Sequence, residues 1–393
     1  MVHHLDTAGL SLVTSGDESP FVRYRGLLRS YHRWIDGGGG DGAFVELVRA
    51  LDDAVAVVDG HGFRRTALAR FEGLDAAAGA RVWVKDETGN VSGSHKGRHL
   101  FGVMLLLRVV EELGEGPANA PLAIASCGNA ALAAAVVAAA AGRALEVFIP
   151  ADADPAVVER LGLLGAQLTV CRREGSTSGD PCYHRFTAAV AAGAIPFGCQ
   201  GRDNGLTIDG GQTLAWEIAE ALADRGVNAR RLVVQVGGGA LASSCIAGFG
   251  DAVTLGVLPS MPVVDTVQTT GAAPLARAFR LLEAGVPLPE AARHRSRYMW
   301  PWETIPASVA RGILDDETYD WLAVVRGMAA TGGSALVVDE ETLIEANRLA
   351  RRATGINVDA TGSAGLAGLL VQARSGVVAA EDDVVVVFSG VAR

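Results

Sequence analysis

The sequence predicts an α/β fold of two domains, each a mostly parallel, twisted sheet flanked by helices. Short runs rich in Val, Ile and Leu alternate with helical stretches, the pattern of parallel strands joined by crossover helices. These runs are apolar throughout rather than at every second position, so we expect both faces of each sheet to be covered. A chain of 393 residues is longer than one compact core usually holds, which favours two domains.

Seven strands and five helices stand out in order along the chain. The predicted strands are 81–85, 121–126, 145–150, 166–171, 231–237, 263–269 and 383–390. The predicted helices are 97–113, 129–141, 211–222, 340–352 and 363–373. Glycine and polar residues cluster in 37–42 and 198–211, which are predicted loops. Residues 286–317 are rich in Arg, Trp and Pro, and they show no clear period.

Composition argues against several classes of protein. A net charge of −10 disfavours nucleic acid as the main partner. The longest apolar run, AALAAAVVAAAAG, is too short to span a bilayer, so no membrane partner is expected. The amino terminus lacks the basic-then-apolar order of an export signal. The five cysteines include no CxxC pair, which predicts reduced thiols in the cytoplasm, and we predict no metal site.

Three predicted strands end in turns rich in glycine or serine, where open α/β sheets bind their ligands. SCGNAA begins at 126, GGGALASS begins at 237, and FSG occupies 388–390. Backbone N–H groups at a helix start or strand end suit an anion. One such turn alone is a weak signal, because glycine-rich turns are more often plain architecture.

Lysine occurs only at Lys85 and Lys96, although Lys and Arg together number 34. A primary amine forms a Schiff base with an aldehyde and a guanidinium cannot, so such a lysine is a candidate for covalent catalysis. Lys96 follows the small-residue loop SGSH at the start of a predicted helix. Lys85 ends a strand beside Asp86 and Glu87, where a buried ion pair is the favoured interpretation. From composition alone, chance survival of two lysines explains the pattern equally well.

The segment KDETGNVSGSHKGR (85–98) resembles the signature of fold-type II pyridoxal phosphate enzymes, in which Lys-x-Glu leads to [ST]-G-S-x-K-x-R. SCGN resembles the Ser-x-Gly-Asn turn of that superfamily, GGGAL its phosphate loop, and FSG the serine facing the pyridine nitrogen. The four motifs occur in the superfamily's order, and together they are far more specific than any one of them. The superfamily includes threonine synthase, serine and threonine dehydratases, cysteine synthase and the tryptophan synthase β chain.

The resemblance implies pyridoxal 5'-phosphate as the cofactor and gives each motif a role. Lys96 would hold the cofactor as a Schiff base and then act as the base on the substrate Cα. Asn129 would bond to the ring hydroxyl, and Ser389 would meet the pyridine nitrogen. The phosphate would be bound by the N–H groups of Gly237, Gly238, Gly239, Ala240 and Leu241. The substrate would be bound by Ser126, Cys127, Gly128 and Asn129, the first three through N–H groups facing its carboxylate.

Three further residues of these motifs receive weaker assignments. The Cys127 thiol is a candidate second acid or base, against the alternative of packing under the cofactor ring. The resemblance places His95 at a commonly aromatic position, where packing is expected, and gives Arg98 a structural pairing.

The predicted reaction follows from Ser389. A hydroxyl favours a protonated pyridine less than a carboxylate does, so loss of a β-group is expected over transamination. We therefore expect a lyase of the serine/threonine dehydratase type acting on a small amino acid, and a homodimer. The resemblance implies a larger cofactor-binding domain (1–94 and 206–393) and a smaller, mobile substrate domain (95–205).

Several alternatives stay open at this stage. PFVRYRGLL and GHGFRRTAL look like degenerate forms of a threonine synthase amino terminus, so β- or γ-replacement of the threonine synthase or cysteine synthase kind is an alternative. A nicotinamide-dependent oxidoreductase is disfavoured because VGGGALASS lacks the GxGxxG spacing. A non-catalytic sensor of pyridoxal phosphate or an amino acid is a third class.

Overall fold

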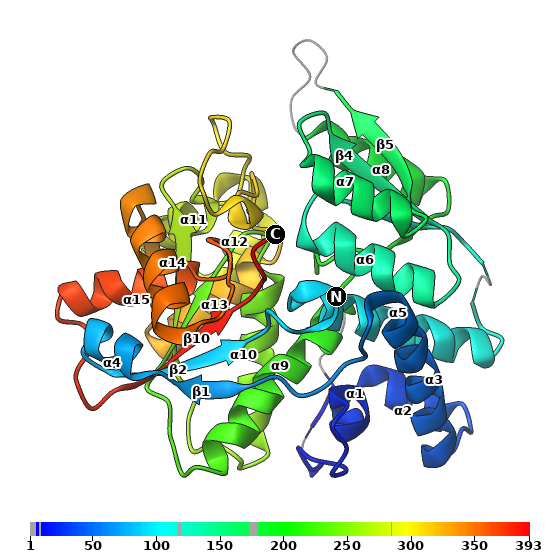
Figure 1. The fold of residues 1–393 in the computed structure, drawn as a ribbon, viewed down its shortest axis with the longest axis horizontal. Helices are drawn as coiled ribbons and strands as arrows, with labels where there is room; N and C mark the ends of the chain where they lie inside the picture. The colour runs from blue at the N-terminus through cyan, green and yellow to red at the C-terminus, as the bar shows by residue number, and fades with distance from the viewer. Residues whose placement is uncertain (1–4, 8, 117–118, 173–179, 284) are drawn as a thin grey trace. The chain divides into compact units, whose positions relative to one another are not determined.

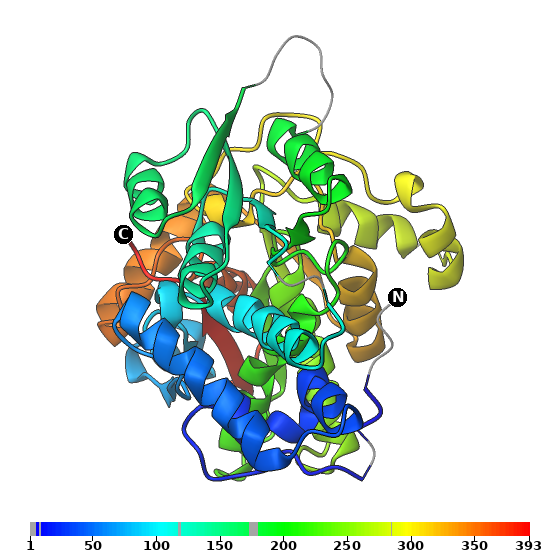
Figure 2. The same ribbon diagram turned by 90° about the vertical axis from the view of Figure 1, so that its right-hand side faces the viewer.

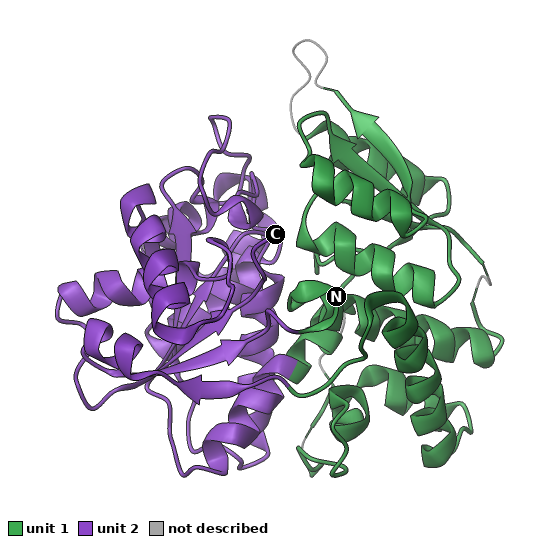
Figure 3. Ribbon diagram, in the orientation of Figure 1, with its two compact units in different colours: residues 1–65, 90–213 green, residues 66–89, 214–393 purple. Residues whose placement is uncertain are grey.

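The structure is a computed structural model that describes residues 5–7, 9–116, 119–172, 180–283 and 285–393 (Figure 1). It comprises two compact units (Figure 3). Unit 1 is Met1–Arg65 with Asn90–Thr213, and unit 2 is Thr66–Gly89 with Leu214–Arg393. Each unit contains its own mostly parallel sheet, so the predicted α/β class is confirmed.

Residues 90–94 and 206–213, predicted in the larger domain, lie in unit 1, but the main difference is at the amino terminus. Sequence analysis grouped 1–94 with the carboxyl-terminal half, whereas 1–65 belong to unit 1. Aromatic packing explains this, because the ring of Phe101 lies 4.4 Å from that of Phe21 and 4.7 Å from that of Phe63. All three rings are buried. The separate roles of the domains and the mobility of the smaller one stay predictions.

Unit 2 is built on a six-stranded sheet in the order β1-β2-β10-β7-β8-β9. Its strands are β1 Leu68–Arg70, β2 Arg81–Asp86, β7 Arg231–Gln235, β8 Val263–Thr269, β9 Ala335–Val338 and β10 Asp383–Phe388. Neighbouring strands are parallel except β1, which runs antiparallel to β2. Every residue of β8 is buried, so coverage of both faces is confirmed for this strand.

Helices cover the two faces of this sheet with separate apolar clusters. Val385 and Val387 of β10 join one cluster with residues of α9, α10, α11 and α13, while Val384 and Val386 join another with residues of α4, α14 and α15. This alternation follows from the two-residue period of a strand. The helices are α4 Glu72–Ala78, α9 Thr207–Ala223, α10 Ala240–Thr254, α11 Pro274–Leu282, α12 Leu288–Arg293, α13 Trp321–Thr331, α14 Glu340–Thr354 and α15 Ala364–Arg374.

Unit 1 has a four-stranded parallel sheet in the order β5-β4-β3-β6. Its strands are β3 Leu122–Ala125, β4 Leu145–Pro150, β5 Gln167–Cys171 and β6 Ile195–Pro196. Its helices are α1 Pro20–Arg23, α2 Arg29–Asp36, α3 Asp41–Asp59, α5 Lys96–Glu112, α6 Asn129–Ala140, α7 Pro155–Leu163 and α8 Pro181–Ala191. The amino-terminal helices, blue in Figure 2, pack against α5 and α6. The expectation of two covered faces is wrong for β5, an edge strand whose Val170 is 54% exposed.

The predicted loops are partly correct. Residues 207–211 form the first turn of α9 rather than the end of a loop. The segment 286–317 is mostly irregular, as expected, apart from α12 and two short 3-10 turns, Arg295–Arg297 and Arg311–Ile313. Within the described residues no helix combines the length and apolar character needed to cross a membrane.

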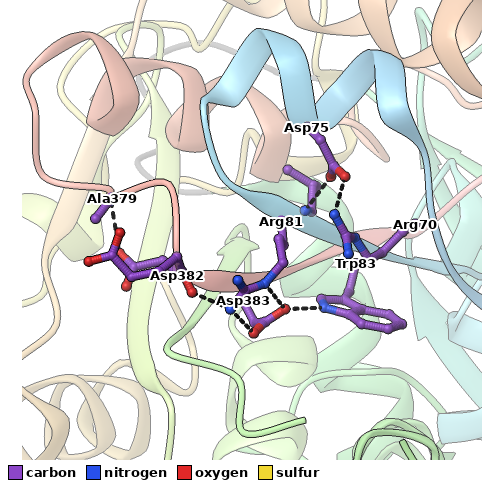
Figure 4. A network of polar contacts seen from close by, with 9 residues as sticks. Arg70, Asp75, Arg81, Trp83, Ala379, Asp382 and Asp383 are labelled. Carbon is purple, nitrogen blue, oxygen red and sulfur yellow. Dashed lines mark hydrogen bonds and ion pairs between the residues drawn. The ribbon is translucent and has the colours of Figure 1, made fainter.

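The amino-terminal ends of β2 and β10 are tied by a polar network (Figure 4). Asp383 accepts hydrogen bonds from Arg81 Nε at 2.9 Å and from Trp83 Nε1 at 2.8 Å. Burial raises the pKa of the Asp383 carboxyl, but these two donors outweigh burial and hold it below its ordinary value. Ligands bind at the carboxyl-terminal edge of parallel strands, so this network at the opposite edge is structural.

Candidate active site

The turn between β7 and α10 holds the glycines of the predicted phosphate loop. Thr318 Oγ1 donates to the carbonyl of Gly237 at 3.0 Å, and Asp320 N donates to that of Gly238 at 2.9 Å. In a trans peptide the N–H points opposite to the carbonyl of the preceding residue. The N–H groups of Gly238 and Gly239 therefore face away from the segment 318–320.

Side chains are excluded from this turn by close packing and by backbone conformation. A Cβ on Gly237 would lie 2.3 Å from Asp315 Oδ2 and 2.9 Å from Ile313 Cα. Gly239 has φ +101°, which favours glycine, and it precedes α10 without a side-chain cap. The first turn of this 15-residue helix thus offers backbone N–H groups, and the helix dipole favours negative charge there.

Ser389 follows β10 at the same carboxyl-terminal edge as the glycine turn. Gln235, the last residue of β7, donates from Nε2 to Ser389 Oγ at 2.6 Å. Both side chains are 3% exposed. Gln235, which comes just before the glycine turn, therefore links this turn to Ser389, although the two motifs are far apart in sequence. Sequence reasoning missed Gln235, although a polar residue inside the apolar run RLVVQV was a visible signal.

A buried carboxyl belongs to the same region of unit 2. Asp359 Oδ1 accepts a hydrogen bond from Gly362 N at 2.5 Å, and the carbonyl of Gly362 accepts from Gln235 at 3.0 Å. Burial raises the pKa of Asp359 to about 6, although the hydrogen bond from Gly362 opposes this. The network around Ser389 thus includes a group that titrates near neutral pH.

In unit 1, Lys96 is the first residue of α5 and is half-buried. The loop before it turns sharply, with φ of 59° at Ser92 and 67° at Gly93. Ser92 N donates to Asp59 Oδ2 at 2.6 Å, and a Cβ on Gly97 would lie 2.9 Å from Val91 O. This tight loop fixes where α5 begins and hence where the Lys96 side chain leaves the backbone.

A neutral histidine lies close to Lys96. Burial, followed by the positive charge of Lys96, lowers the pKa of His99 to about 3. His99 Nδ1 lies 2.8 Å from the carbonyl of Thr207, and since a carbonyl only accepts, we assign the proton to Nδ1. The His95 ring packs edge-on against His99 at 5.5 Å, which fits the packing role expected for it.

The turn 126–128 joins β3 to α6, and Asn129 is the first residue of that helix. All four residues are half-buried, and no side chain caps the helix start. Helix α6 contains no charged residue, and it packs against α5 and against the 3-10 turn Val91–Gly93 before Lys96. Unit 1 therefore carries the predicted carboxylate turn and the Lys96 loop on neighbouring elements. The acid–base role of Cys127 stays a prediction.

Lys85 has a different setting in unit 2. Its Nζ lies 2.5 Å from Glu217 Oε2 and donates to the carbonyl of Thr66 at 2.8 Å. The predicted buried ion pair is present, and Glu217 of α9, far along the chain, is a partner that the sequence did not indicate. Only 1% of the side chain is exposed. A compact ammonium suits this position better than the larger, planar guanidinium.

The family model described as "Pyridoxal-phosphate dependent enzyme" matches residues 61–390. The chain belongs to this family. Like other members it is a pyridoxal-phosphate-dependent enzyme, and the fold-type II assignment made from the motifs is confirmed. Among the described residues, no group of three or more His, Cys, Asp or Glu side chains could hold a metal ion.

Individual relatives carry different names. The chain is 25% identical to the threonine synthase of Methanosarcina acetivorans over 310 residues, 79% of this chain and 70% of that protein. It is also 25% identical to the threonine synthase of Methanocaldococcus jannaschii, over 48% of this chain but only 42% of that protein. Among solved structures, the threonine deaminase of T.th. superposes with a TM-score of 0.64 at 22% identity, covering 88% of this chain and 98% of that one. The last match concerns the fold alone.

The described residues of this family member fit pyridoxal phosphate. By chemical type, the Lys96 amine would suit the aldehyde, the N–H groups of the glycine turn would suit the phosphate, and the Ser389 hydroxyl would suit the ring nitrogen. Two buried hydroxyls, Ser94 Oγ and Ser243 Oγ, have no hydrogen-bond partner among the described residues. Ser94 lies two residues before Lys96, and Ser243 lies one turn into α10. Buried polar groups are normally satisfied, so these two are consistent with places where a ligand binds.

Proposed function

We propose that this enzyme is a lyase that removes the β-substituent of a small amino acid and releases a 2-oxo acid and ammonia. The observation that carries the proposal is the neutral pair of Ser389 and Gln235 at the position assigned to the pyridine nitrogen. A carboxylate there would stabilise a protonated ring, and a hydroxyl bonded to an amide does so much less. Weaker electron withdrawal by the ring favours loss of a β-group over transamination.

Each predicted residue has a task in this proposal. When bound, the cofactor supplies an electron sink for the electron pair left on the substrate Cα. Lys96 would attach the cofactor through its amine, and its Nζ would accept the proton from the substrate Cα. Backbone N–H groups of Ser126, Cys127 and Gly128 orient the substrate carboxylate at the start of α6. The N–H groups at the start of α10 hold the phosphate.

A replacement reaction of the threonine synthase kind is the second candidate, supported by the names of the curated relatives. Its phosphorylated substrate requires cations for a second phosphate. Arg98 is fully buried and donates to Thr213 Oγ1 at 3.1 Å. Arg231 pairs with Asp265 at 2.9 Å at the amino-terminal end of β7, the edge opposite to the glycine turn. Structural bonds therefore engage two of the three candidate arginines, and Arg202 is the candidate left for a second phosphate; we favour elimination because of the neutral pair of Ser389 and Gln235.

A substrate screen distinguishes the two candidates. The protein loaded with pyridoxal phosphate is incubated with L-serine, L-threonine or O-phospho-L-homoserine, and 2-oxo acid, threonine and inorganic phosphate are measured. Elimination predicts 2-oxo acid from serine or threonine. Threonine and phosphate from O-phospho-L-homoserine, without 2-oxo acid from the other two, would replace the proposal with the second candidate.

Lys96→Arg tests the attachment point. The substitution keeps the positive charge but removes the primary amine, so turnover should fall to the background rate while the circular dichroism spectrum is retained. Borohydride reduction followed by peptide mapping should place the cofactor on the Lys96 peptide in wild type and nowhere in the variant. A reduced adduct on another residue would show that Lys96 is not the anchor.

A further inference from the structure

The amide of Gln235 is fixed in one orientation by backbone carbonyls. Its Nε2 lies 3.0 Å from the carbonyl oxygen of Gly362 and 3.1 Å from that of Val387. Carbonyls only accept, so the nitrogen must face them. Turning the amide over would place Oε1 against two carbonyl oxygens and lose both bonds, so the assignment of N and O here follows from chemistry.

This orientation restricts the Ser389 hydroxyl. The two protons of Nε2 are shared among three oxygens, and the shortest contact, 2.6 Å, is to Ser389 Oγ. Ser389 Oγ therefore accepts from Gln235, and its single proton points away from the amide. A hydroxyl held in this way acts as a donor toward a further partner. It suits a ring nitrogen that accepts a hydrogen bond, which is the unprotonated form.

The other end of the amide disfavours a purely structural role. Gln235 Oε1 is buried and has no hydrogen-bond partner among the described residues. A Cβ on Gly365 of α15 would lie 3.0 Å from this oxygen, so the helix packs closely against it. An unsatisfied buried acceptor lowers stability, and an apolar side chain of equal length would avoid that loss.

We propose that Gln235 is a positioning residue that holds Ser389 as a hydrogen-bond donor and thereby keeps the pyridine nitrogen unprotonated. The inference rests on the proposed function, since that places Ser389 at the ring. It deepens the proposal by naming what sets the ring nitrogen's protonation. Gln235 acts through Ser389 and is not a catalytic residue.

Asp359 is a titratable neighbour in the same network, linked to it through Gly362 N at 2.5 Å. A pH measurement must therefore distinguish the effect of Asp359 from that of Gln235.

A double-mutant cycle tests the coupling. Wild type, Gln235→Met, Ser389→Ala and the double variant are prepared as apoproteins and titrated with pyridoxal phosphate, and the absorbance of the bound cofactor is recorded against pH. Gln235→Met should weaken cofactor binding roughly tenfold, about the loss of one hydrogen bond, and should shift the pH at which the absorbance changes. Since Gln235 acts through Ser389, the double variant should be no worse than Ser389→Ala.

Three further variants make the result decisive. Gln372 of α15 is also 3% exposed, and its Oε1 has no hydrogen-bond partner in the described part of the chain. It gives the matched control Gln372→Met, which should leave affinity and spectrum unchanged. Asp359→Asn should leave the Gln235 effect in place if the two are independent. If Gln235→Met does not fold, Gln235→Leu is a smaller apolar substitution that also lacks the amide donor, so it should show the same direction of change.

The outcomes also separate this inference from the proposed function. Gln235 has only a packing role if its variants keep the wild-type affinity and spectrum. The same conclusion follows if their effect simply adds to that of Ser389→Ala. These readouts need no turnover, so they hold whichever reaction the enzyme catalyses. The proposed function fails instead if the substrate screen yields no 2-oxo acid.

Discussion

At the residue scale, the two lysines of this arginine-rich chain answer to different physical requirements. Lys96 begins a helix beside a neutral histidine, and its proposed role requires a primary amine. Lys85 is almost completely buried, and this position requires a compact positive charge rather than the larger guanidinium. The local sequence already favoured an ion pair for Lys85, but it did not indicate Glu217 as a partner, because that residue lies far along the chain.

Replacing Lys85 tests that distinction. Because only 1% of the Lys85 side chain is exposed, Lys85→Arg should overpack the site and lower the free energy of unfolding by about 1–3 kcal/mol. Lys85→Met removes the cation that lies beside the buried Glu217 carboxylate and should lose about 3–5 kcal/mol. Urea unfolding of the three proteins measures both. Equal stability of wild type and Lys85→Met would show that the ion pair contributes nothing.

Asp359 should lower the stability of the folded protein as the pH rises, which is the opposite of the effect of a carboxyl group whose pKa is lowered on folding. Its folded-state pKa of about 6 lies above the ordinary value of 3.8, so the folded protein holds this proton more tightly than the unfolded chain does. The resulting stabilisation is complete below pH 3.8 and is lost as the pH rises through about 6. Asp359→Asn keeps an acceptor for Gly362 and should be more stable than wild type at pH 7.5, by up to about 3 kcal/mol.

Urea unfolding of the apoproteins at pH 4 and pH 7.5 checks this expectation. The difference between the two proteins should shrink toward zero at the lower pH. A variant that is less stable than wild type at pH 7.5 would mean that the ionised Asp359 is stabilising after all.

At the scale of elements, the turn between β7 and α10 depends on glycine for space as well as for conformation. The carbonyls of Gly237 and Gly238 bond to the segment 318–320, so the turn is held against unit 2 from one side. Ile313 and Asp315 fill the room that a side chain would need. The irregular segment 286–317 thus supplies part of the support for the predicted phosphate loop.

Gly237→Ala should therefore weaken cofactor binding by at least about tenfold and lower stability by about 1–3 kcal/mol, because backbone atoms of Ile313 must move. Gly250→Ala, within α10 where a Cβ meets nothing within 4 Å, is the matched control and should stabilise the helix by about 0.5–1 kcal/mol. Fluorescence titration with pyridoxal phosphate measures the first effect. Unchanged affinity in Gly237→Ala would remove this turn from the cofactor site.

Elements were more predictable from sequence than contacts were. All seven predicted strands are present, because continuous apolar runs bounded by glycine are a strong local signal. The short strands β1, β6 and β9 were missed, since they contain four residues or fewer and are defined by their neighbours in the sheet. Motifs pointed to Lys96 and Ser389, but Gln235 and Asp315 matter through partners distant in sequence, and spacing alone does not report such pairs.

At the scale of the whole molecule, the chain passes between the two units three times, after Arg65, Gly89 and Thr213. The buried network of Lys85 includes Thr66 and Glu217, and Thr66 Oγ1 also donates to Glu87 Oε1 at 2.5 Å. These three partners lie close in sequence to the three crossings. Within unit 2, one buried network, centred on the Lys85 ammonium group and the Thr66 hydroxyl, therefore ties together the three segments by which the chain enters or leaves that unit.

The position of β10 between β2 and β7 has a consequence for synthesis on the ribosome. All strands of unit 1 are translated before Leu214, whereas β2 and β7 must wait for residues 383–388 before their shared neighbour exists. Stalled nascent chains ending near residue 370 should contain a protease-resistant unit 1 beside a protease-sensitive unit 2, and equal resistance of the two would contradict this order. Until β10 emerges, the edges of β2 and β7 are exposed and can pair incorrectly. Unit 2 should therefore need protection by chaperones for longer than unit 1.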